Sequence, residues 1–253
     1  MKAIILSAGH GTRLLPLTDN LPKCLLEVAA DTSILAWQLR QLAVAGIDDV
    51  VVVTGYRANK VAAEVERVNR DHGTSARVLE NSDFANMDNI GSAWCASHEM
   101  NQDFIILNGD TLFRASIPTQ LVQQAHAPIR VTLSQKSGYD DDDMKVSLDS
   151  SGQLTAVGKN ICLSQTQAES IGMILFRGAG VRRFREKLDA LVASPDPLGR
   201  GYYLAAIDSL ARETPLQTCV VDQDLWCEID FPDDLAEARK LLGQWNAQLL
   251  RAG

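Results

Sequence analysis

Apolar residues follow two alternating patterns along the first half of the chain. Short unbroken runs, such as the four consecutive valines at 50–53, are typical of strands buried on both faces of a sheet. Longer segments between them have helical spacing, and the clearest, 33–46, ends on a glycine. We predict strands over 3–6, 49–54, 76–79 and 103–107, and helices over 33–46, 57–69 and 88–100. This alternation predicts a mostly parallel sheet with helices on both faces.

The second half of the chain is less regular, and we expect its strands to be partly antiparallel. Strands are predicted over 130–135, 145–148, 154–157, 171–176, 217–221 and 226–229, and helices over 180–192 and 202–212. A last helix is predicted from Pro232, because proline at the first position and Asp233 and Asp234 in the first turn favour a helix start. Ser194-Pro-Asp-Pro197 predicts a loop rather than a domain boundary.

These elements predict one domain over residues 1–253. Its class is α/β: a Rossmann-like, three-layer α/β/α fold with a mixed, mostly parallel central sheet. In such a sheet, ligands bind outside the carboxyl ends of the strands. The residues that follow each buried strand are therefore the first candidates for a functional site.

Composition and charge narrow the class of protein. The 253 residues are 46% hydrophobic and 22% charged, as in a globular protein with a sizeable core. A net charge of −8 without a basic stripe argues against a nucleic-acid partner. The chain enters its first strand directly and has no apolar run near the roughly 18 residues of a membrane span, so we expect a cytoplasmic protein with no membrane partner. Its five cysteines form no Cys-x-x-Cys pair, which favours reduced thiols over a zinc site.

The loop after the first strand carries the strongest chemical signal. Small residues over 7–12 lead to Arg13, and Lys23 follows a proline ten residues later. Gly9 and Gly11 would let the backbone approach a ligand and turn its N–H groups inward. Arg13 would then bring a forked positive charge, and Lys23 a point charge, to phosphate oxygens. The combination predicts a nucleotide-triphosphate site rather than a surface turn with two unrelated cations.

Two better-known phosphate motifs do not match this loop. The Rossmann fingerprint needs a third glycine where this chain has Leu14, and the Walker loop needs a Gly-Lys-[Ser/Thr] triplet that the sequence lacks. The loop is therefore a phosphate site of another kind.

Two carboxylates follow predicted strands of this sheet. Asp110 stands in Asn-Gly-Asp after the strand at 103–107, and Asp230 follows the strand at 226–229. Alone, Asp110 could be a turn residue and Asp230 a helix cap. Beside a phosphate loop, however, two hard oxygen ligands are what Mg²⁺ needs, so we predict that both residues bind Mg²⁺. The four aspartates at 140–143 favour a solvated loop instead, because successive residues cannot all face one ion.

Several of these segments, in this order, resemble the nucleotidyltransferase (pyrophosphorylase) superfamily, which includes the sugar-1-phosphate nucleotidylyltransferases. They are the Ala-Gly-His-Gly-Thr-Arg opening with its Leu-Pro-Lys, the Asn-Gly-Asp, Val157-Gly158-Lys159 and Glu228-Ile229-Asp230. The stretch 81–94 and the ending 226–235 are most similar to the phosphocholine cytidylyltransferase branch. The chain departs from that branch at Asp88, where a second Asn is usual, and at Ala93, where Leu is usual.

The resemblance implies a role for each matching residue. Catalysis would fall to Arg13, Lys23, Asp110, Lys159 and Asp230, with Asp110 and Asp230 as the metal ligands. Nucleotide binding would involve Leu6, Ala8, Gly9, Gly11, Thr12, Arg13, Lys23, Asn81, Asn89 and Asp110. Lys159 would hold the acceptor's phosphate, and Lys145 is a weaker candidate that is equally well explained as a strand-edge lysine. Asn81 or its neighbours would contact a pyrimidine edge.

The acceptor is left open by the sequence. A choline group favours an aromatic cage through cation–π attraction, with Phe113, Tyr139, Tyr202, Tyr203 and Trp226 as candidate walls. Of these we predict that Tyr139 and Trp226 bind the acceptor, together with Lys159 and Glu169. Ordinary core packing explains most of these residues equally well. A hexose would want polar contacts to its hydroxyls, for which Glu169 and Ser170 are candidates. Inositol phosphate, aminoethylphosphonate and a hexose-1-phosphate therefore stay alternatives to phosphocholine as the acceptor.

The implied reaction needs no protein nucleophile. A phosphate oxygen of the acceptor attacks the α-phosphorus of a nucleoside triphosphate, CTP being favoured, and pyrophosphate leaves. Catalysis is then positioning and neutralisation of charge by the cations and Mg²⁺. Three alternatives remain: a hexose-1-phosphate uridylyl- or thymidylyltransferase, a guanylyltransferase for a molybdopterin-like cofactor, and a non-catalytic nucleotide-binding regulatory module. Retention of Lys23, Asp110 and Asp230 favours an enzyme over the last.

Overall fold

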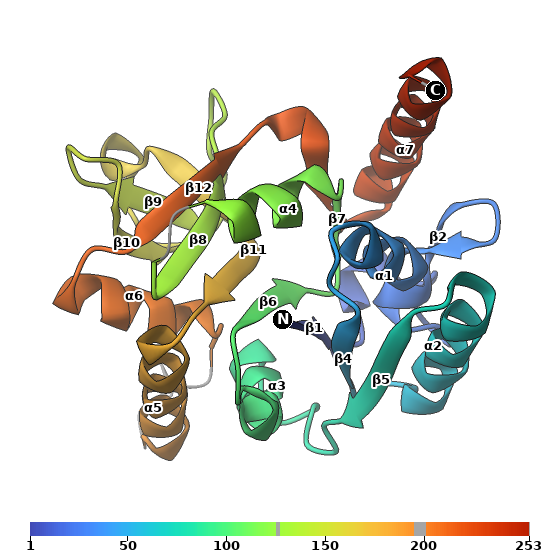
Figure 1. Cartoon of the computed structure of the whole chain (residues 1–253), viewed down its shortest axis with the longest axis horizontal. Helices are drawn as coiled ribbons and strands as arrows, with labels where there is room; N and C mark the ends of the chain where they lie inside the picture. The colour runs from blue at the N-terminus through green and yellow to red at the C-terminus, as the bar shows by residue number, and fades with distance from the viewer. Residues whose placement is uncertain (125–126, 195–200, 253) are drawn as a thin grey trace.

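A computed structural model describes residues 1–124, 127–194 and 201–252 of the chain. Within these residues the main sheet has nine strands, in the order β10-β9-β11-β6-β1-β4-β5, with β8 beside β11 and β12 beside β8 (Figure 1). The strands are β1 Lys2–Ser7, β4 Asp49–Thr54, β5 Ser75–Glu80, β6 Phe104–Asn108, β8 Ile129–Ser134, β9 Lys145–Leu148, β10 Leu154–Gly158, β11 Ala168–Phe176 and β12 Gln217–Val221. The predicted α/β class with a mixed sheet is confirmed.

Parallel and antiparallel pairing divide this sheet as the sequence predicted. β6, β1, β4 and β5 pair in parallel, as do β8 and β12, whereas β11 runs antiparallel to β6, β8 and β9. Two short pairs lie outside it: β2 Glu27–Ala29 with β3 Thr32–Ser33, and β7 Thr111–Phe113 with β13 Trp226–Glu228. The sequence analysis predicted β13 but not β2, β3 or β7, because two or three residues are too few to show a period.

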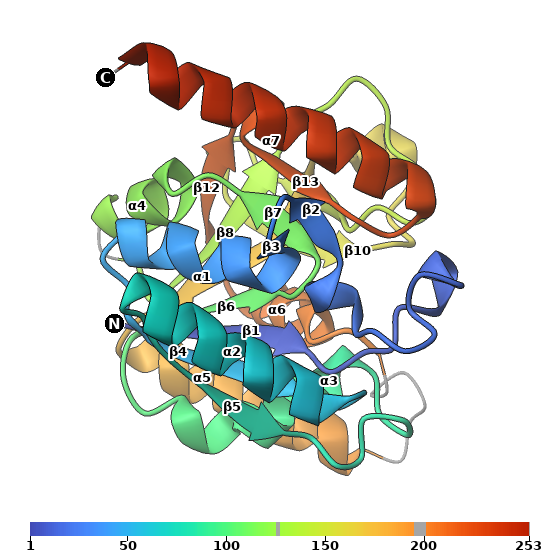
Figure 2. The same cartoon turned by 90° about the vertical axis from the view of Figure 1, so that its right-hand side faces the viewer.

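Helices cover both faces of the sheet (Figures 1 and 2). On one face lie α1 Ile34–Val44, α2 Ala58–His72 and α4 Ser116–Gln123, and on the other α3 Asn89–Cys95, α5 Ala179–Ala193 and α6 Leu204–Glu213. The last helix, α7 Pro232–Ala252, packs outside α1, where the rings of Trp37 and Trp245 stack with centroids 5.7 Å apart. The loop predicted at 194–197 extends outside the described residues. Across the described part of the chain, no helix has both the length and the apolar content of a bilayer-spanning segment.

Most predicted boundaries agree with the structure to within a few residues, and the exceptions have local causes. α2 continues to His72, where Gly73 in the left-handed region ends it, rather than stopping at residue 69. The predicted helix over 88–100 ends as an α-helix at Cys95 and continues as the 3-10 helix Ala96–Glu99. α4 was not predicted; its Pro118 lies in the first turn, where proline is tolerated.

Gly172 shows why β11 is irregular near the site. The register of β11 against β8 shifts between Ser170 and Ile174, and Gly172 lies there with φ of 70°. A Cβ atom at Gly172 would stand 2.3 Å from Nδ2 of Asn108, at the carboxyl end of β6. Only glycine therefore fits both the backbone angle and the close approach of Asn108.

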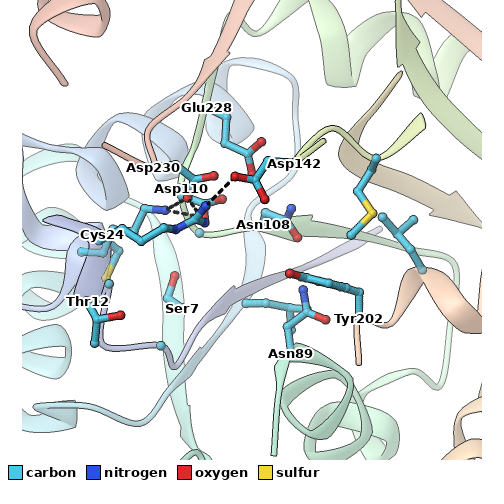
Figure 3. Close-up of a pocket in the computed structure, with 18 of the residues that line it drawn as sticks. Ser7, Thr12, Cys24, Asn89, Asn108, Asp110, Asp142, Tyr202, Glu228 and Asp230 are labelled. Atoms are coloured by element: carbon cyan, nitrogen blue, oxygen red, sulfur yellow. Dashed lines mark hydrogen bonds and ion pairs between the residues drawn. The ribbon is translucent and has the colours of Figure 1, made fainter. Parts of the chain in front are cut away.

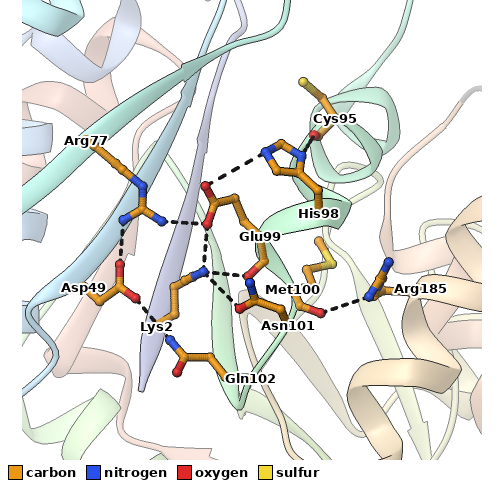
Figure 4. Close-up of polar contacts among 10 residues, drawn as sticks. All are labelled: Lys2, Asp49, Arg77, Cys95, His98, Glu99, Met100, Asn101, Gln102 and Arg185. Carbon is orange, nitrogen blue, oxygen red and sulfur yellow. Dashed lines mark hydrogen bonds and ion pairs between the residues drawn. The ribbon is translucent and has the colours of Figure 1, made fainter.

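A charge network, buried at Lys2 and partly exposed at Arg77 and Asp49, joins the amino ends of the strands, opposite the carboxyl ends of β1 and β6 (Figure 4). Nζ of Lys2, which is 4% exposed, donates to Oε2 of Glu99 at 2.7 Å and to its backbone oxygen at 2.8 Å. Arg77 donates to the same Glu99 carboxylate at 2.6 Å and to Asp49 at 2.6 Å. β1, β4, β5 and the 3-10 helix after α3 are thus held at one point.

We expect Glu99→Gln to lower the free energy of unfolding at neutral pH by roughly 1.5–3 kcal/mol, the usual range for hydrogen bonds to charged groups. Burial raises the pKa of Glu99, but Lys2 and Arg77 outweigh it and hold the pKa below its usual value. Stability from this carboxylate is therefore present above the unfolded pKa and lost as pH falls through the lower folded pKa. Urea unfolding at neutral and acidic pH measures both effects. Glu66→Gln, at an exposed α2 position, is the control, and an equal loss there would contradict the expectation.

Candidate active site

A cleft opens at the carboxyl ends of β1 and β6, with a volume of about 330 Å³ (Figure 3). Its walls come from the loop after β1, the turn after β6, the end of β13, the loop before β9, the end of β10 and the start of α6. This is the place that the strand order predicts for a ligand.

The loop after β1 forms one wall of the cleft. Leu6, Gly9, Gly11, Thr12 and Arg13 line it. Ala8, which was predicted to bind the nucleotide, does not line the cleft. Its backbone oxygen accepts a hydrogen bond from the amide of Tyr56 at 3.0 Å.

Gly11 requires its glycine, because it lies in the left-handed region and a Cβ there would stand 2.8 Å from Cβ of Lys23. The buried Thr18 hydroxyl fixes this turn by donating to the Gly11 oxygen at 2.8 Å.

Lys23 lies between the two carboxylates that the sequence singled out. Its Nζ donates to Oδ2 of Asp110 at 2.8 Å and to Oδ1 of Asp230 at 2.7 Å. Burial alone would lower the pKa of Lys23, but the charges of Asp110 and Asp230 outweigh it and raise that pKa. The ammonium therefore stays charged at neutral pH. Arg13 adds a second cation, donating to Oδ1 of Asp230 at 2.6 Å.

The short β7–β13 pair explains why Asp110 and Asp230 meet although they are far apart in sequence. Glu228 stands opposite Thr111, and the Ile229 amide donates to the Asp110 backbone oxygen at 3.1 Å. Asp110 directly precedes β7, and Asp230 lies two residues after the end of β13, so pairing of the two strands brings the aspartates together. The two side chains lie side by side (Figure 3) and, together with Lys23, form one charged group in the cleft lining.

The donor set of this group suits a hard divalent cation. Oδ1 of Asp110 is buried and has no hydrogen-bond partner within the described structure, so one ligand position is left over. Among the described residues, no three His, Cys, Asp or Glu side chains are grouped as ligands of one ion. Two carboxylates completed by phosphate oxygens and water are the usual arrangement for Mg²⁺ in nucleotide sites. The residues present therefore fit the predicted metal.

Glu228 is a cleft residue that the sequence analysis did not assign to the site. It lines the cleft beside Asp110 and Asp230 (Figure 3). Glu228 is exposed to the open cleft, yet the surrounding protein atoms, followed by the negative charges of Asp110 and Asp230, raise its pKa above its usual value. The sequence pattern could have indicated this position. Residues i and i+2 of an extended segment share a face, so Glu228 is expected on the same side as Asp230.

The opposite wall of the cleft holds Lys159 and Tyr202. Nζ of Lys159 lies 5.0 Å from the Tyr202 ring centre and 3.0 Å from Oδ1 of Asp142. Burial would lower the pKa of Lys159, but its hydrogen bonds to Asp142 and Tyr202 outweigh burial and raise it. Lys145 is 3% exposed and donates from Nζ to the Lys159 backbone oxygen at 2.9 Å, so it supports Lys159 rather than lining the cleft.

The two asparagines predicted for nucleotide binding lie in different surroundings. Asn89, the first residue of α3, lines the cleft and accepts from the Tyr203 amide at 2.8 Å. Asn81 is 5% exposed and outside the cleft lining, donating to Ser92 at 3.2 Å and accepting from the Asp83 amide at 3.1 Å. Asn89 is therefore placed to touch a ligand directly, whereas Asn81 shapes the loop before it.

Three residues predicted to bind the acceptor stand outside the cleft lining. Glu169 pairs with Lys136 at 2.8 Å, and burial raises its pKa to about 7 despite that partner. Tyr139 lies beneath the same Lys136, with 5.8 Å from Nζ to the ring centre. Trp226 packs against the core that α1 and α4 cover. Among the five aromatic candidates for a choline cage, Tyr202 lines the cleft, whereas Phe113 and Tyr203 are fully buried.

The four aspartates at 140–143 do form a loop, but not one that is only solvated. Asp142 lines the cleft and pairs with Arg13 and Lys159, and Asp143 pairs with Lys136 at 2.8 Å. The sequence showed a charge run but not the cations facing it, because Arg13 and Lys159 come from distant loops.

Comparison with known proteins agrees with this geometry. The sequence profile of the nucleotidyl transferase family matches residues 2–140, more than half of the chain. The chain belongs to this family. Its members are enzymes that transfer a nucleoside monophosphate, so the predicted enzyme class is confirmed.

Several relatives are cytidylyltransferases. The chain is 25% identical to the CTP:phosphoglutamine cytidylyltransferase of Campylobacter jejuni, over 93% of this chain and 98% of that protein. It is 29% identical to the choline-phosphate cytidylyltransferase of Streptococcus pneumoniae, over 50% of this chain and 52% of that protein. It is also 26% identical to the N-acetylmuramate alpha-1-phosphate uridylyltransferase of Neisseria meningitidis, over 97% of this chain and 100% of that protein.

A solved structure shows the same fold. The CTP:phosphocholine cytidylyltransferase LicC of Streptococcus pneumoniae superposes with a TM-score of 0.72 at 19% identity, over 95% of this chain and 98% of that chain. The predicted resemblance to the superfamily and its cytidylyltransferase branch is confirmed.

Proposed function

We propose that this nucleotidyltransferase is a cytoplasmic, Mg²⁺-dependent cytidylyltransferase of a single domain over 1–253. It would transfer CMP from CTP to a small phosphorylated acceptor, phosphocholine or a related phospho-alcohol or phosphonate, and release pyrophosphate. The observation that carries the proposal is the gathering of Arg13, Lys23 and Lys159 with Asp110 and Asp230 in one cleft. Cytidylyltransferases among the relatives favour CTP.

In the proposed mechanism, the residues of this chain would accelerate the reaction mainly by binding and orienting the two substrates. Arg13 and Lys23 would hold the triphosphate and offset the charge that builds on the departing pyrophosphate. Lys159 would hold the acceptor phosphate in line with the α-phosphorus, which converts a bimolecular reaction into a positioned one. Asp110 and Asp230 would hold Mg²⁺, which when bound supplies further charge stabilisation to the phosphates. An anionic phosphate oxygen is itself the nucleophile, so no general base is needed.

A second candidate is transfer of UMP to a sugar-1-phosphate. The near full-length match to a uridylyltransferase favours it. So does the cleft lining, which among the described residues holds one aromatic side chain, Tyr202, rather than a cage. A single tyrosine still supports cation–π contact with an ammonium group, so the cytidylyltransferase proposal stands first.

The test is pyrophosphate release from each nucleotide against each acceptor. CTP, UTP, dTTP and GTP are combined with phosphocholine, aminoethylphosphonate, inositol-1-phosphate and glucose-1-phosphate, with and without Mg²⁺. We expect release with CTP, one acceptor and Mg²⁺, and little without metal. Release with UTP and a sugar phosphate would instead select the second candidate. Tight CTP binding without release across the panel would count against every acceptor named here.

A further inference from the structure

The carboxylate of Asp142 lies between the two cations that face each other across the cleft. Its Oδ2 is 3.5 Å from Nη1 of Arg13, and its Oδ1 is 3.0 Å from Nζ of Lys159. Figure 3 shows Asp142 reaching into the cleft near Asp110 and Asp230. One anion with two oxygens directed at two separate cations has the arrangement that a bridging phosphate group would adopt.

The loop that carries Asp142 is held in place by Asp143, whereas the Asp142 side chain itself is largely exposed to solvent. Asp143 accepts from Nζ of Lys136 at 2.8 Å and from the Asp140 amide at 2.6 Å, and Lys136 is held in turn by Glu169 at 2.8 Å. The Asp142 side chain, by contrast, is 61% exposed. Ion pairs of exposed side chains are weak and exchange with solvent and other ions. Asp142 can therefore leave its partners without unfolding the loop.

The Asp142 side chain is held in its ionised form in this position. Its hydrogen bond to Lys159 and the charge of that lysine hold the pKa of Asp142 below its usual value. Lys23 is paired with Asp110 and Asp230, and Arg13 is paired with Asp230 at 2.6 Å as well as with Asp142. Asp142 is therefore the carboxylate that Arg13 and Lys159 share. An incoming phosphate that needs Arg13 and Lys159 together must therefore displace Asp142.

We propose that Asp142 occupies the place between Arg13 and Lys159 where substrate phosphate binds, as a built-in competitor that phosphate ligands displace. The inference rests on the proposed function, which assigns Arg13 to the nucleotide and Lys159 to the acceptor. It adds that the two phosphates meet at the point that the Asp142 carboxylate occupies.

The test is the binding of inorganic pyrophosphate to the full chain, measured by titration calorimetry. Asp142→Asn keeps the shape of the side chain and removes its charge. We expect it to bind pyrophosphate roughly tenfold more tightly than the wild type, with the gain shrinking as salt is added. Asp141→Asn removes the same charge from the neighbouring exposed residue and should stay within about twofold of the wild type. Equal gains in the two variants would overturn the proposal, since general charge would then explain them.

Hydrogen exchange separates displacement from simple repulsion. In the wild type, pyrophosphate should not slow exchange of the amides over 140–143, because Asp142 leaves its partners while Asp143 still holds the loop; protection of these amides would contradict the proposal. The outcome is also independent of turnover. Tighter pyrophosphate binding by Asp142→Asn with no release across the acceptor panel would retain this inference and reject the proposed function. Turnover by the wild type together with unchanged pyrophosphate affinity in Asp142→Asn would retain the proposed function and reject this inference.

Discussion

Lys23→Ala should lower kcat of this nucleotidyltransferase by about 10²–10³-fold, the usual effect of removing one donor to transition-state charge. The expected loss is large because Lys23 is 14% exposed and points into the phosphate end of the cleft. Removing water from around a charge strengthens its interactions with a ligand. The fall should be in kcat more than in KM, since the charge on the departing pyrophosphate grows in the transition state.

The measurement is pyrophosphate release under saturating nucleotide and acceptor, with circular dichroism to confirm the fold. Lys240→Ala, at an exposed position of α7, removes the same charge far from the cleft and should retain wild-type rates. Lys23→Ala also leaves Asp110 and Asp230 without the ammonium between them, so added Mg²⁺ should raise its melting temperature more than that of the wild type. A folded Lys23→Ala variant with near-wild-type kcat would reject Lys23 as a catalytic residue.

The proposed nucleotide side of the cleft could be located from sequence because short-range rules fix it. Gly11 is needed for one backbone angle, Lys23 follows at a short distance, and Asp110 follows a strand that its apolar run identifies. The rule that ligands bind at the carboxyl ends of strands then brings Asp110 and Asp230 to one place. The structure brings them together as expected, and it adds the β7–β13 pair that accomplishes this.

The acceptor side could not be predicted to the same degree. Lys159 was expected there, but Asp142 was assigned to solvent. Tyr202 was named only as a candidate cage wall, whereas Tyr139 and Trp226 were predicted to bind the acceptor. These residues come from separate loops, whose conformations depend on tertiary contacts rather than on any period in the sequence. Glu169 shows the same limit, since its position ahead of Gly172 suggested a ligand contact, whereas Lys136 binds it outside the cleft lining.

Asp110→Asn should have the larger effect on turnover, roughly 10³-fold, because metal-assisted charge stabilisation is worth several kcal/mol and each 1.4 kcal/mol is a factor of ten. Asparagine keeps the size of the side chain but offers a neutral oxygen. One carboxylate oxygen of Asp110 binds Lys23, and the other is buried without a partner within the described structure. The substitution therefore removes charge from both places at once.

Metal dependence distinguishes this loss from that of Lys23→Ala. In Asp110→Asn, the Mg²⁺ concentration for half-maximal rate should rise, and Mn²⁺ binding in the presence of CTP, followed by electron paramagnetic resonance, should weaken. In Lys23→Ala, Mn²⁺ binding should be retained or strengthened, since a competing cation is gone from between Asp110 and Asp230. Asp48→Asn, at an exposed residue before β4, is the matched control for loss of one carboxylate. If Asp110→Asn lost turnover but kept wild-type Mn²⁺ binding, Asp110 would act by holding Lys23 rather than a metal, because that is the other contact its carboxylate makes.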